Sequence, residues 1–344
     1  AADITTSLVK PIDLLTADMD NDGDVDFVTV SGNYGGHEKI TWFENDGAAN
    51  PSFTATTIAA SDGTLNTLLF PIEVDIGDID NDGDLDILVG EDSGNSDIGR
   101  IFLYENDGAT DPSFTLAATF DDGFKVVRSS RFVDLDNDGD LDIVATTRNN
   151  SKSILWYEND GAGNPTFTQG VISSISLSSG NTPYKLSYGD FDDDGDVDIL
   201  SASSAGSSIK IFENDGADNP SFTEKTIETN LSGVSSVQLG DIDLDGDLDV
   251  IGGGYFADQI NWYANDGRAN STFTSNNIAS NIDGPDEIQI GDIDNDGDLD
   301  IISVSQNDDK LVWFESDVAS NNDNAVMAQA GNDYTATSGT LTFN

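Results

Sequence analysis

The stretch Asp18-Met19-Asp20-Asn21-Asp22-Gly23-Asp24-Val25-Asp26 occurs in closely similar form six times along the chain. When its residues are numbered 1 to 9, aspartate stands at positions 1, 3, 5, 7 and 9 of every copy, and glycine stands at position 6. Five carboxylates in so short a segment repel one another unless a cation lies among them. Positions 1, 3 and 5 would give Ca²⁺ side-chain oxygens, position 7 its backbone carbonyl and position 9 a bidentate carboxylate, while the glycine permits the sharp turn.

The sequence therefore predicts six calcium-binding loops and about six bound Ca²⁺ as the cofactor. The candidate ligands share the odd-numbered positions of the loops. They are Asp18, Asp20, Asp22, Asp24 and Asp26; Asp78, Asp80, Asp82, Asp84 and Asp86; Asp134, Asp136, Asp138, Asp140 and Asp142; Asp190, Asp192, Asp194, Asp196 and Asp198; Asp241, Asp243, Asp245, Asp247 and Asp249; and Asp292, Asp294, Asp296, Asp298 and Asp300.

Two other interpretations of the loops were considered. Clusters of Asp, Asn and Gly are common in hairpin turns, but six intact copies at regular spacing favour a metal site. An EF-hand loop requires Glu at position 12, and none of the copies has it. Each loop also runs into a β-branched, apolar segment such as Ile301–Ser303, which indicates a strand and not an exiting helix. The residues at position 12 are Thr29, Val89, Ala145, Ser201, Gly252 and Ser303.

The loops begin 51 to 60 residues apart, and a second phrase, first seen from Trp42 to Thr54, follows them along the chain. Four short β-like runs fit into one period. In the fifth repeat they are 235–240, 248–253, 259–263 and 273–278. Four antiparallel strands in about 50 residues are typical of one propeller blade. The sequence thus predicts an all-β fold, a six-bladed β-propeller with four antiparallel strands per blade.

The ends of the chain suggest how the propeller closes. The sixth repeat loses the fourth-strand phrase after Phe314, and an orphan strand-like segment, Asp3–Val9, precedes the first repeat. We expect this N-terminal strand to complete the last blade, which leaves no exposed edge. Residues 1–320 would form the propeller and 321–344 a C-terminal tail or linker, although 339–343 could compete for the same edge.

Aromatic residues stand at equivalent positions of the third strands, and we expect them to pack between neighbouring blades. They are Trp42, Tyr104, Trp156, Phe212, Trp262 and Trp313.

Charge and composition restrict the partners. Lys and Arg number 13 against 65 acidic residues, a formal net charge of −52, which disfavours nucleic acid and anionic membranes. No apolar run is long enough to span a membrane. The chain contains no cysteine and begins Ala1-Ala2-Asp3, which fits a mature exported form. Calcium loops of modest affinity are occupied outside the cell, where free calcium is high. We therefore expect a secreted or cell-surface protein. The chain would be a monomeric propeller within a larger secreted protein.

The Asp-x-Asp-x-Asp-Gly-x-x-Asp loop entering an Ile-Asp-Ile-Val-like strand resembles the FG-GAP/VCBS repeat, the unit of the integrin α-subunit propeller. The resemblance covers about residues 3–318. It implies calcium between the first two strands of a blade, on the face opposite the one where partners usually dock. The chain departs from integrin propellers, which have seven blades and calcium in only some of them. Since the family includes adhesion receptors, lectins and enzyme-appended domains, the resemblance does not identify a ligand.

The loops that join strands 2–3 and 4–1 would lie on that opposite face, and they vary most between repeats. Variable loops on a rigid scaffold often build a binding surface, although such residues can also merely solubilise a loop. The candidate ligand-binding residues are Tyr34, His37, Arg100, Arg128, Arg131, Arg148, Tyr184 and Tyr255; Phe124, Lys125, Lys152, Phe256 and Lys310 lie in the same loops.

The sequence offers little to support catalysis. It has no Cys nucleophile, its single histidine is His37, and it lacks a nucleophile elbow or a phosphate loop. We therefore expect a non-catalytic recognition or adhesion module for a polysaccharide or a protein. Two alternatives remain open: a propeller domain of a polysaccharide-degrading lyase or glycosidase, and a purely structural spacer.

Overall fold

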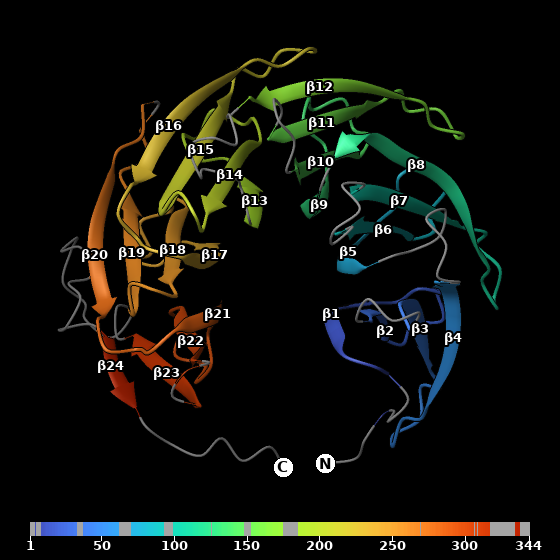
Figure 1. Cartoon of the computed structure of the whole chain (residues 1–344), viewed down its shortest axis with the longest axis horizontal. Coiled ribbons are helices and arrows are strands. Elements are labelled where there is room, and N and C mark those ends of the chain that lie inside the picture. The colour runs from blue at the N-terminus through green and yellow to red at the C-terminus, as the bar shows by residue number, and fades with distance from the viewer. Residues whose placement is uncertain are drawn as a thin grey trace. The chain divides into compact units, whose positions relative to one another are not determined.

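A computed structural model describes residues 4, 8–32, 37–61, 70–92, 99–124, 126–147, 153–174, 185–268, 270–305, 307, 309–316 and 334–337. Within these ranges the chain is all-β (Figure 1), and it has no helix of the length and hydrophobicity that a membrane span requires. The strands form six four-stranded antiparallel sheets, each a run of four consecutive strands. The predicted class, a β-propeller of six blades, is confirmed.

The chain divides into two compact units, Ala1–Leu177 and Ser178–Asn344. The first unit holds three blades, drawn from blue to green in Figure 1. Their strands are β1 (Pro11–Ala17), β2 (Asp26–Ser31), β3 (Lys39–Asn45) and β4 (Phe53–Ala60); β5 (Pro71–Gly77), β6 (Asp86–Glu91), β7 (Gly99–Asn106) and β8 (Phe114–Phe124); and β9 (Val127–Val133), β10 (Asp142–Thr147), β11 (Ile154–Asn159) and β12 (Phe167–Ser173).

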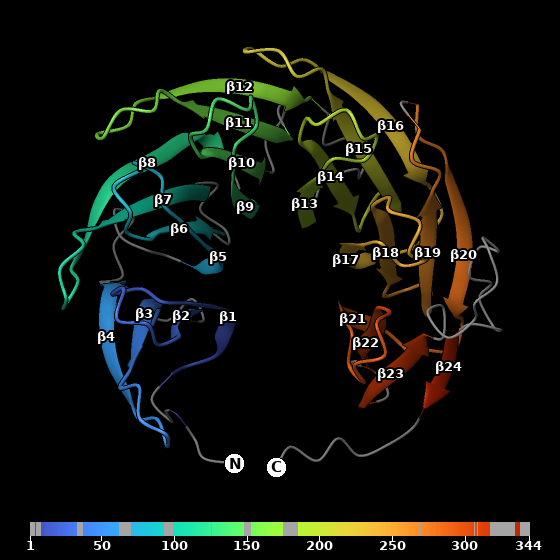
Figure 2. The same cartoon turned by 180° about the vertical axis from the view of Figure 1, so that it is seen from behind.

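The second unit holds the other three blades, seen from behind in Figure 2. Their strands are β13 (Lys185–Gly189), β14 (Asp198–Ser203), β15 (Ser208–Asn214) and β16 (Phe222–Glu228); β17 (Val234–Gly240), β18 (Asp249–Gly254), β19 (Gln259–Asn265) and β20 (Phe273–Ala279); and β21 (Pro285–Gly291), β22 (Asp300–Ser305), β23 (Lys310–Ser316) and β24 (Tyr334–Thr337). The domain boundaries predicted above remain a prediction.

Neighbouring blades bury a shared apolar core. In the first unit, Trp42 of β3 clusters with Val74 and Ile87 of the next blade, and its ring centroid lies 6.1 Å from that of Phe114. The predicted packing role of the third-strand aromatics is thus confirmed at this position. Its equivalents Tyr104, Trp156, Phe212 and Trp262 are also buried, whereas Trp313 is half-buried.

Side chains on the first strands connect neighbouring blades further. The Asp13 carboxylate on β1 accepts the Val74 N–H of β5 at 3.0 Å. One blade on, the Glu73 carboxylate accepts the Ser130 N–H of β9 at 2.9 Å. Each bond joins a side chain of one blade to the backbone of the next, so it fixes the spacing of the two blades.

The predicted closure by the N-terminal strand is wrong for the described residues. The fourth place in the last sheet belongs to β24, which pairs antiparallel with β23 from Trp313↔Thr337 to Ser316↔Tyr334. Ile4 lies in a bend, and Leu8 to Lys10 are not in a strand. Residue 3 and residues 5–7 lie outside the described residues, as does the alternative segment 339–343. The edge of β23 offers backbone N–H and C=O groups to any extended segment, and β24 from the tail pairs with it.

Candidate metal centre

Each aspartate loop connects the first and second strands of its blade, and its turn has the same shape in all six copies. Position 4 has positive φ, 58° at Asn21 and 59° at Leu244 for example, and position 6 is glycine, with φ of 95° at Gly23. A Cβ at Gly23 would meet nothing within 4 Å. The glycine is therefore required by the backbone conformation and not by space.

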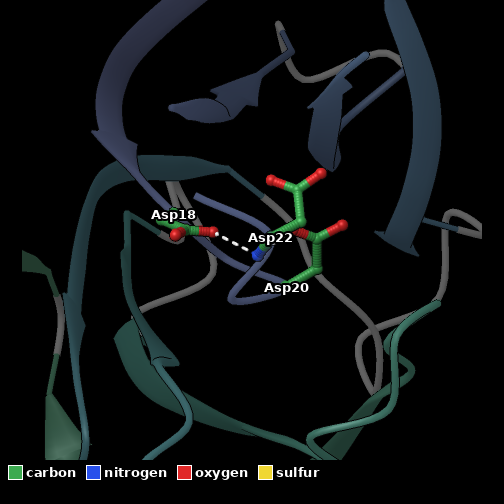
Figure 3. Close-up of side chains that lie close together, drawn as sticks. All are labelled: Asp18, Asp20 and Asp22. Atoms are coloured by element: carbon green, nitrogen blue, oxygen red, sulfur yellow. Dashed lines mark hydrogen bonds between the residues drawn. The ribbon is translucent and has the colours of Figure 1, made fainter. Parts of the chain in front are cut away.

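The carboxylate at position 1 holds the turn together. In the first loop, Asp18 Oδ1 accepts the Asp22 N–H at 3.1 Å and Oδ2 accepts the Gly23 N–H at 2.9 Å. The first of these bonds is the dashed line in Figure 3. The same pair of bonds recurs in the second loop at Asp78. The loop therefore keeps its curvature through its own backbone donors.

The carboxylates at positions 1 and 3 approach a third one closely. In the first loop, one oxygen of each of Asp18, Asp20 and Asp22 lies within 4.8 Å of the others (Figure 3). Other loops bring together either positions 1, 3 and 5 or positions 1, 3 and 9. The further sets are Asp134, Asp136 and Asp138; Asp190, Asp192 and Asp194; Asp78, Asp80 and Asp86; and Asp241, Asp243 and Asp249.

Position 3 carries carboxylate oxygens that are shielded from solvent in several of the loops. The Oδ1 atoms of Asp136, Asp192 and Asp243 are shielded from solvent and have no hydrogen-bond partner among the described residues. Burial, followed by the neighbouring carboxylates, raises the pKa of Asp136 to about 6 and that of Asp243 to about 7. A carboxylate oxygen that is shielded from solvent and accepts no hydrogen bond suits a hard cation such as Ca²⁺, which prefers oxygen ligands.

The aspartate at position 9 is the first residue of the second strand and is fully buried. In the first loop, Asp26 Oδ2 accepts the Met19 N–H at 3.2 Å and the Trp42 Nε1–H at 3.0 Å, and Oδ1 accepts the Asn45 N–H at 2.8 Å. In the second blade, burial raises the pKa of the equivalent Asp86 to about 7, against backbone hydrogen bonds that lower it. Position 9 thus ties the loop to the third strand, whatever else it binds.

The side chain at position 7 lies against a neighbouring turn. A Cβ added at Gly47, in the Asn-Asp-Gly turn of the same blade, would lie 1.8 Å from Asp24 Oδ2. In the second blade the Asp84 carboxylate also accepts the Asn21 amide of the first blade at 2.9 Å. Since this side chain is engaged with the turn, the backbone carbonyl is the group that position 7 would offer a cation, and its role as a ligand stays a prediction.

Two sets of residues were missed by sequence reasoning, although both lie in the Trp-Phe-Glu-Asn-Asp-Gly phrase. The first is the glutamate that stands one residue before the end of the third strand. Burial and the neighbouring aspartates raise the pKa values of Asp20 and Asp136, and the charges of Glu44 and Glu158 raise them further, so these glutamates add to the negative field of their loops. The fifth blade has Ala264 at this place. The recurrence of this phrase from repeat to repeat could have indicated that its glutamate has a role.

The second set is the asparagine that follows this glutamate, which connects the loops of neighbouring blades. The Asn159 amide donates to the Ile79 carbonyl in the preceding loop at 2.8 Å and to the Leu141 carbonyl of its own loop at 2.9 Å. Asn106 and Asn265 make the same two contacts. In the last blade Ser316 takes this place.

The candidate ligand-binding residues have diverse surroundings. Arg100 is buried, with Nε 2.5 Å from Glu91 Oε1 and its guanidinium 5.0 Å from the Phe102 ring centroid. Arg131 lies 2.7 Å from Glu73 Oε1. Both guanidinium groups therefore have a structural partner inside the first unit.

The other candidates are nearer the surface or outside the described residues. Arg128 Nη2 lies 3.5 Å from Asp92 Oδ2, His37 is exposed, and Tyr255 lies beside the exposed Phe256. Tyr34, Arg148 and Tyr184 are outside the described residues.

Comparison with solved structures shows the same fold in distant proteins. A protein from Lactobacillus plantarum is 15% identical, with a TM-score of 0.61 over 95% of this chain and 88% of that one. The periplasmic gluconolactonase of Pseudomonas aeruginosa is 15% identical, with a TM-score of 0.57 over 91% of this chain and 85% of that one. A protein from Desulfotomaculum acetoxidans is 13% identical, with a TM-score of 0.55 over 89% of this chain and 82% of that one. At these identities the similarity shows the fold alone.

The family comparison is more specific. The comparison with curated proteins found no match. The family model described as FG-GAP-like repeat matches five overlapping stretches, 18–89, 78–145, 134–201, 190–252 and 241–303. Each match runs from one aspartate loop through the next, so the matched unit includes the loops described above. The chain therefore belongs to the FG-GAP-like repeat family.

Proposed function

We propose that the chain is a calcium-binding recognition module without catalytic activity, which works outside the cytoplasm. The observation that carries the calcium assignment is the set of shielded, unpartnered carboxylate oxygens at position 3, at Asp136, Asp192 and Asp243. Each of these three aspartates also has a carboxylate oxygen within 4.8 Å of oxygens from two other aspartates of its loop. Such oxygens are costly to bury unless a positive charge compensates them.

Calcium fits these loops better than magnesium. Mg²⁺ requires near-ideal octahedral geometry and keeps several of its waters, whereas Ca²⁺ accepts carboxylates and backbone carbonyls in flexible arrangements. The loops offer carboxylates at positions 1, 3 and 5, and the carboxylates at positions 7 and 9 are partly engaged elsewhere. This irregular, anionic set is typical of a Ca²⁺ ligand set.

Recognition is assigned to the loops at the other end of the strands, since the metal loops fill one end of each blade. A polysaccharide or protein is the expected class of partner, because a net charge of −52 repels nucleic acid and anionic surfaces. Extracellular calcium is abundant enough to fill sites of modest affinity, which supports a secreted or cell-surface location.

The calcium assignment can be tested by titration calorimetry on the full chain after dialysis against a chelator. We expect about six sites per chain. D136N removes one charge from a shielded position-3 carboxylate and should reduce the stoichiometry by about one site. D111N removes the same charge from an exposed aspartate outside the loops and should leave the stoichiometry unchanged. Identical titrations for D136N and D111N would contradict the assignment.

A further inference from the structure

Two aromatic rings stand at the surface where the fifth and sixth blades meet. Phe256 is 72% exposed. Its ring centroid lies 5.1 Å from that of Tyr255, and the two ring planes are nearly perpendicular, at 86°. Around them lie Asn307, Asp258 and Asp283, and these five residues together are called the aromatic corner below. The corner lies in the connections at the end of the blades away from the aspartate loops.

The backbone holds the Phe256 side of the corner in place. The Tyr255 N–H donates to the Gly233 carbonyl at 2.9 Å, and the Phe256 N–H donates to the Ser232 carbonyl at 3.1 Å. Gly233 has a φ of +71°, and a Cβ there would lie 2.5 Å from Phe256 Cδ2. One side of the exposed ring therefore lies against the Gly233 backbone, and the other side is open to a ligand.

The Tyr255 side is held by polar contacts to the sixth blade. The Tyr255 hydroxyl donates to Asn307 Oδ1 at 3.0 Å, and the Asn307 amide donates to Asp283 Oδ1 at 3.1 Å. The Gly284 N–H donates to Asp258 Oδ1 at 3.1 Å. These bonds orient two carboxylates and an amide around the rings before any ligand arrives.

Two glycines distinguish this pair of blades from the first three. Gly233 and Gly284, which precede the first strands of the fifth and sixth blades, both have positive φ and both lie against corner residues. In the first three blades the residue before the first strand is Lys10, Phe70 or Val126. A side chain at either glycine would displace Phe256 or Asn307, so the repeat pattern alone would not produce the corner.

We propose that the aromatic corner binds a neutral polysaccharide, with the C–H face of one pyranose ring on Phe256 and sugar hydroxyls donating to Asp258 and Asp283. The proposal rests on the recognition function proposed above and names its ligand class. Two rings with a few oriented polar groups suit a small ligand, whereas a stable protein interface needs about 800 Å² on each partner with an apolar centre. The net charge of −52 disfavours acidic polysaccharides.

A cationic peptide is the main competing ligand. It would be attracted by acidic residues over the whole surface, and its affinity would fall steeply as salt is added. A neutral sugar would bind with little dependence on salt. Salt dependence therefore separates the two ligand classes.

The test uses the full chain saturated with calcium and titrated by calorimetry with cellohexaose, laminarihexaose, maltohexaose, xylohexaose and mannohexaose. At least one of these should bind, equally well at low and at high NaCl. F256A should weaken that binding at least tenfold, while F256Y, which keeps a ring, should stay within about threefold of wild type. Y255F removes the hydroxyl bond to Asn307 and should weaken binding several-fold. Y188A, at an exposed tyrosine on β13, is the matched control and should bind as wild type.

Three outcomes would overturn the proposal: no binding of any of the five hexasaccharides, equal binding by wild type and F256A, or salt-sensitive binding of pentalysine that F256A abolishes. Melting of the same samples with and without chelator reports on the calcium loops separately. Failure of the aromatic corner can therefore be distinguished from failure of the calcium-binding module.

Discussion

The aspartate at position 9 stabilises the fold and is also a proposed calcium ligand. Asp26 has both oxygens engaged with N–H donors, from Met19 and Trp42 on one oxygen and Asn45 on the other. A carboxylate with this many donors is held in one orientation. It can then lend a remaining lone pair to a cation without moving. The loop is thus preorganised by its own hydrogen bonds.

Asp75 on β5 is a half-buried carboxylate outside the aspartate loops, and it leads to a prediction on pH. Its Oδ2 accepts the Phe132 N–H at 2.7 Å. Burial raises its pKa from 3.8 to about 6, although the Arg131 charge opposes the shift. Because the folded-state pKa lies above the unfolded one, the folded state holds this proton more tightly. Asp75 therefore favours folding below about pH 4, and that contribution is lost as the pH rises to 6.

D75N should remove this pH dependence, because the amide is neutral and its oxygen can still accept the Phe132 N–H. With calcium saturating, we expect D75N to exceed wild type in free energy of unfolding at pH 7.5 by up to about 3 kcal/mol, and to match it near pH 4. Urea unfolding at the two pH values measures the difference. A difference that is the same at both values would show that Asp75 is not held in a raised-pKa state.

At the scale of the strands, blade-to-blade contacts of the third-strand asparagine lead to a second prediction. N159A leaves the Ile79 and Leu141 carbonyls without the amide that now donates to them. We expect it to lower the free energy of unfolding by about 1–3 kcal/mol. N276A is the matched control, since its amide donates within its own strand, to the Thr274 carbonyl. Equal stability of N159A and N276A in urea unfolding would contradict a bridging role.

The last blade allows the opposite substitution, in which the missing asparagine is introduced. Ser316 stands where the other blades have the asparagine, and its Oγ is buried without a hydrogen-bond partner among the described residues. S316N would place an amide near the Ile242 and Leu299 carbonyls, the equivalents of those that Asn265 contacts. We expect a gain of about 1 kcal/mol in the free energy of unfolding, read from the same unfolding curves. A loss of stability would mean that the blade has no room for the amide.

Strand positions were the part of the fold that the sequence predicted best. In the fifth repeat the predicted runs 235–240, 248–253, 259–263 and 273–278 correspond to β17, β18, β19 and β20 within two residues. Alternation and turn residues act locally, so a repeated phrase is enough to place them. Closure of the last blade was predicted wrongly, because an open edge can pair with any extended segment and nothing local in the repeats identifies β24 as the one that does.

The grouping of aspartates in the candidate site was also predictable from the sequence, since it depends on spacing within one loop. Positions 1 and 3 come together with position 5 in three of the loops and with position 9 in two others, and the spacing within the loop indicates such groups. The tie from Asn159 to the preceding loop and the pairing of Arg131 with Glu73 depend on how neighbouring blades face each other. Nothing in a single repeat records that arrangement. The same holds for the aromatic corner, which needs glycines in two different blades.

At the scale of the whole molecule, we expect calcium to be a component of the folded state. Without a cation each loop confines five aspartates, and a ligand at about 100 times its Kd adds about 2.7 kcal/mol per site to the free energy of unfolding. Several such sites would dominate the stability of an ordinary domain.

The most direct measurement is thermal melting of the full chain in millimolar calcium and again in excess EDTA, with magnesium added back in a third sample. We expect the melting temperature to fall by more than about 10 °C in EDTA, to return with calcium, and to recover only in part with magnesium. Superimposable melts in calcium and in EDTA would contradict the account.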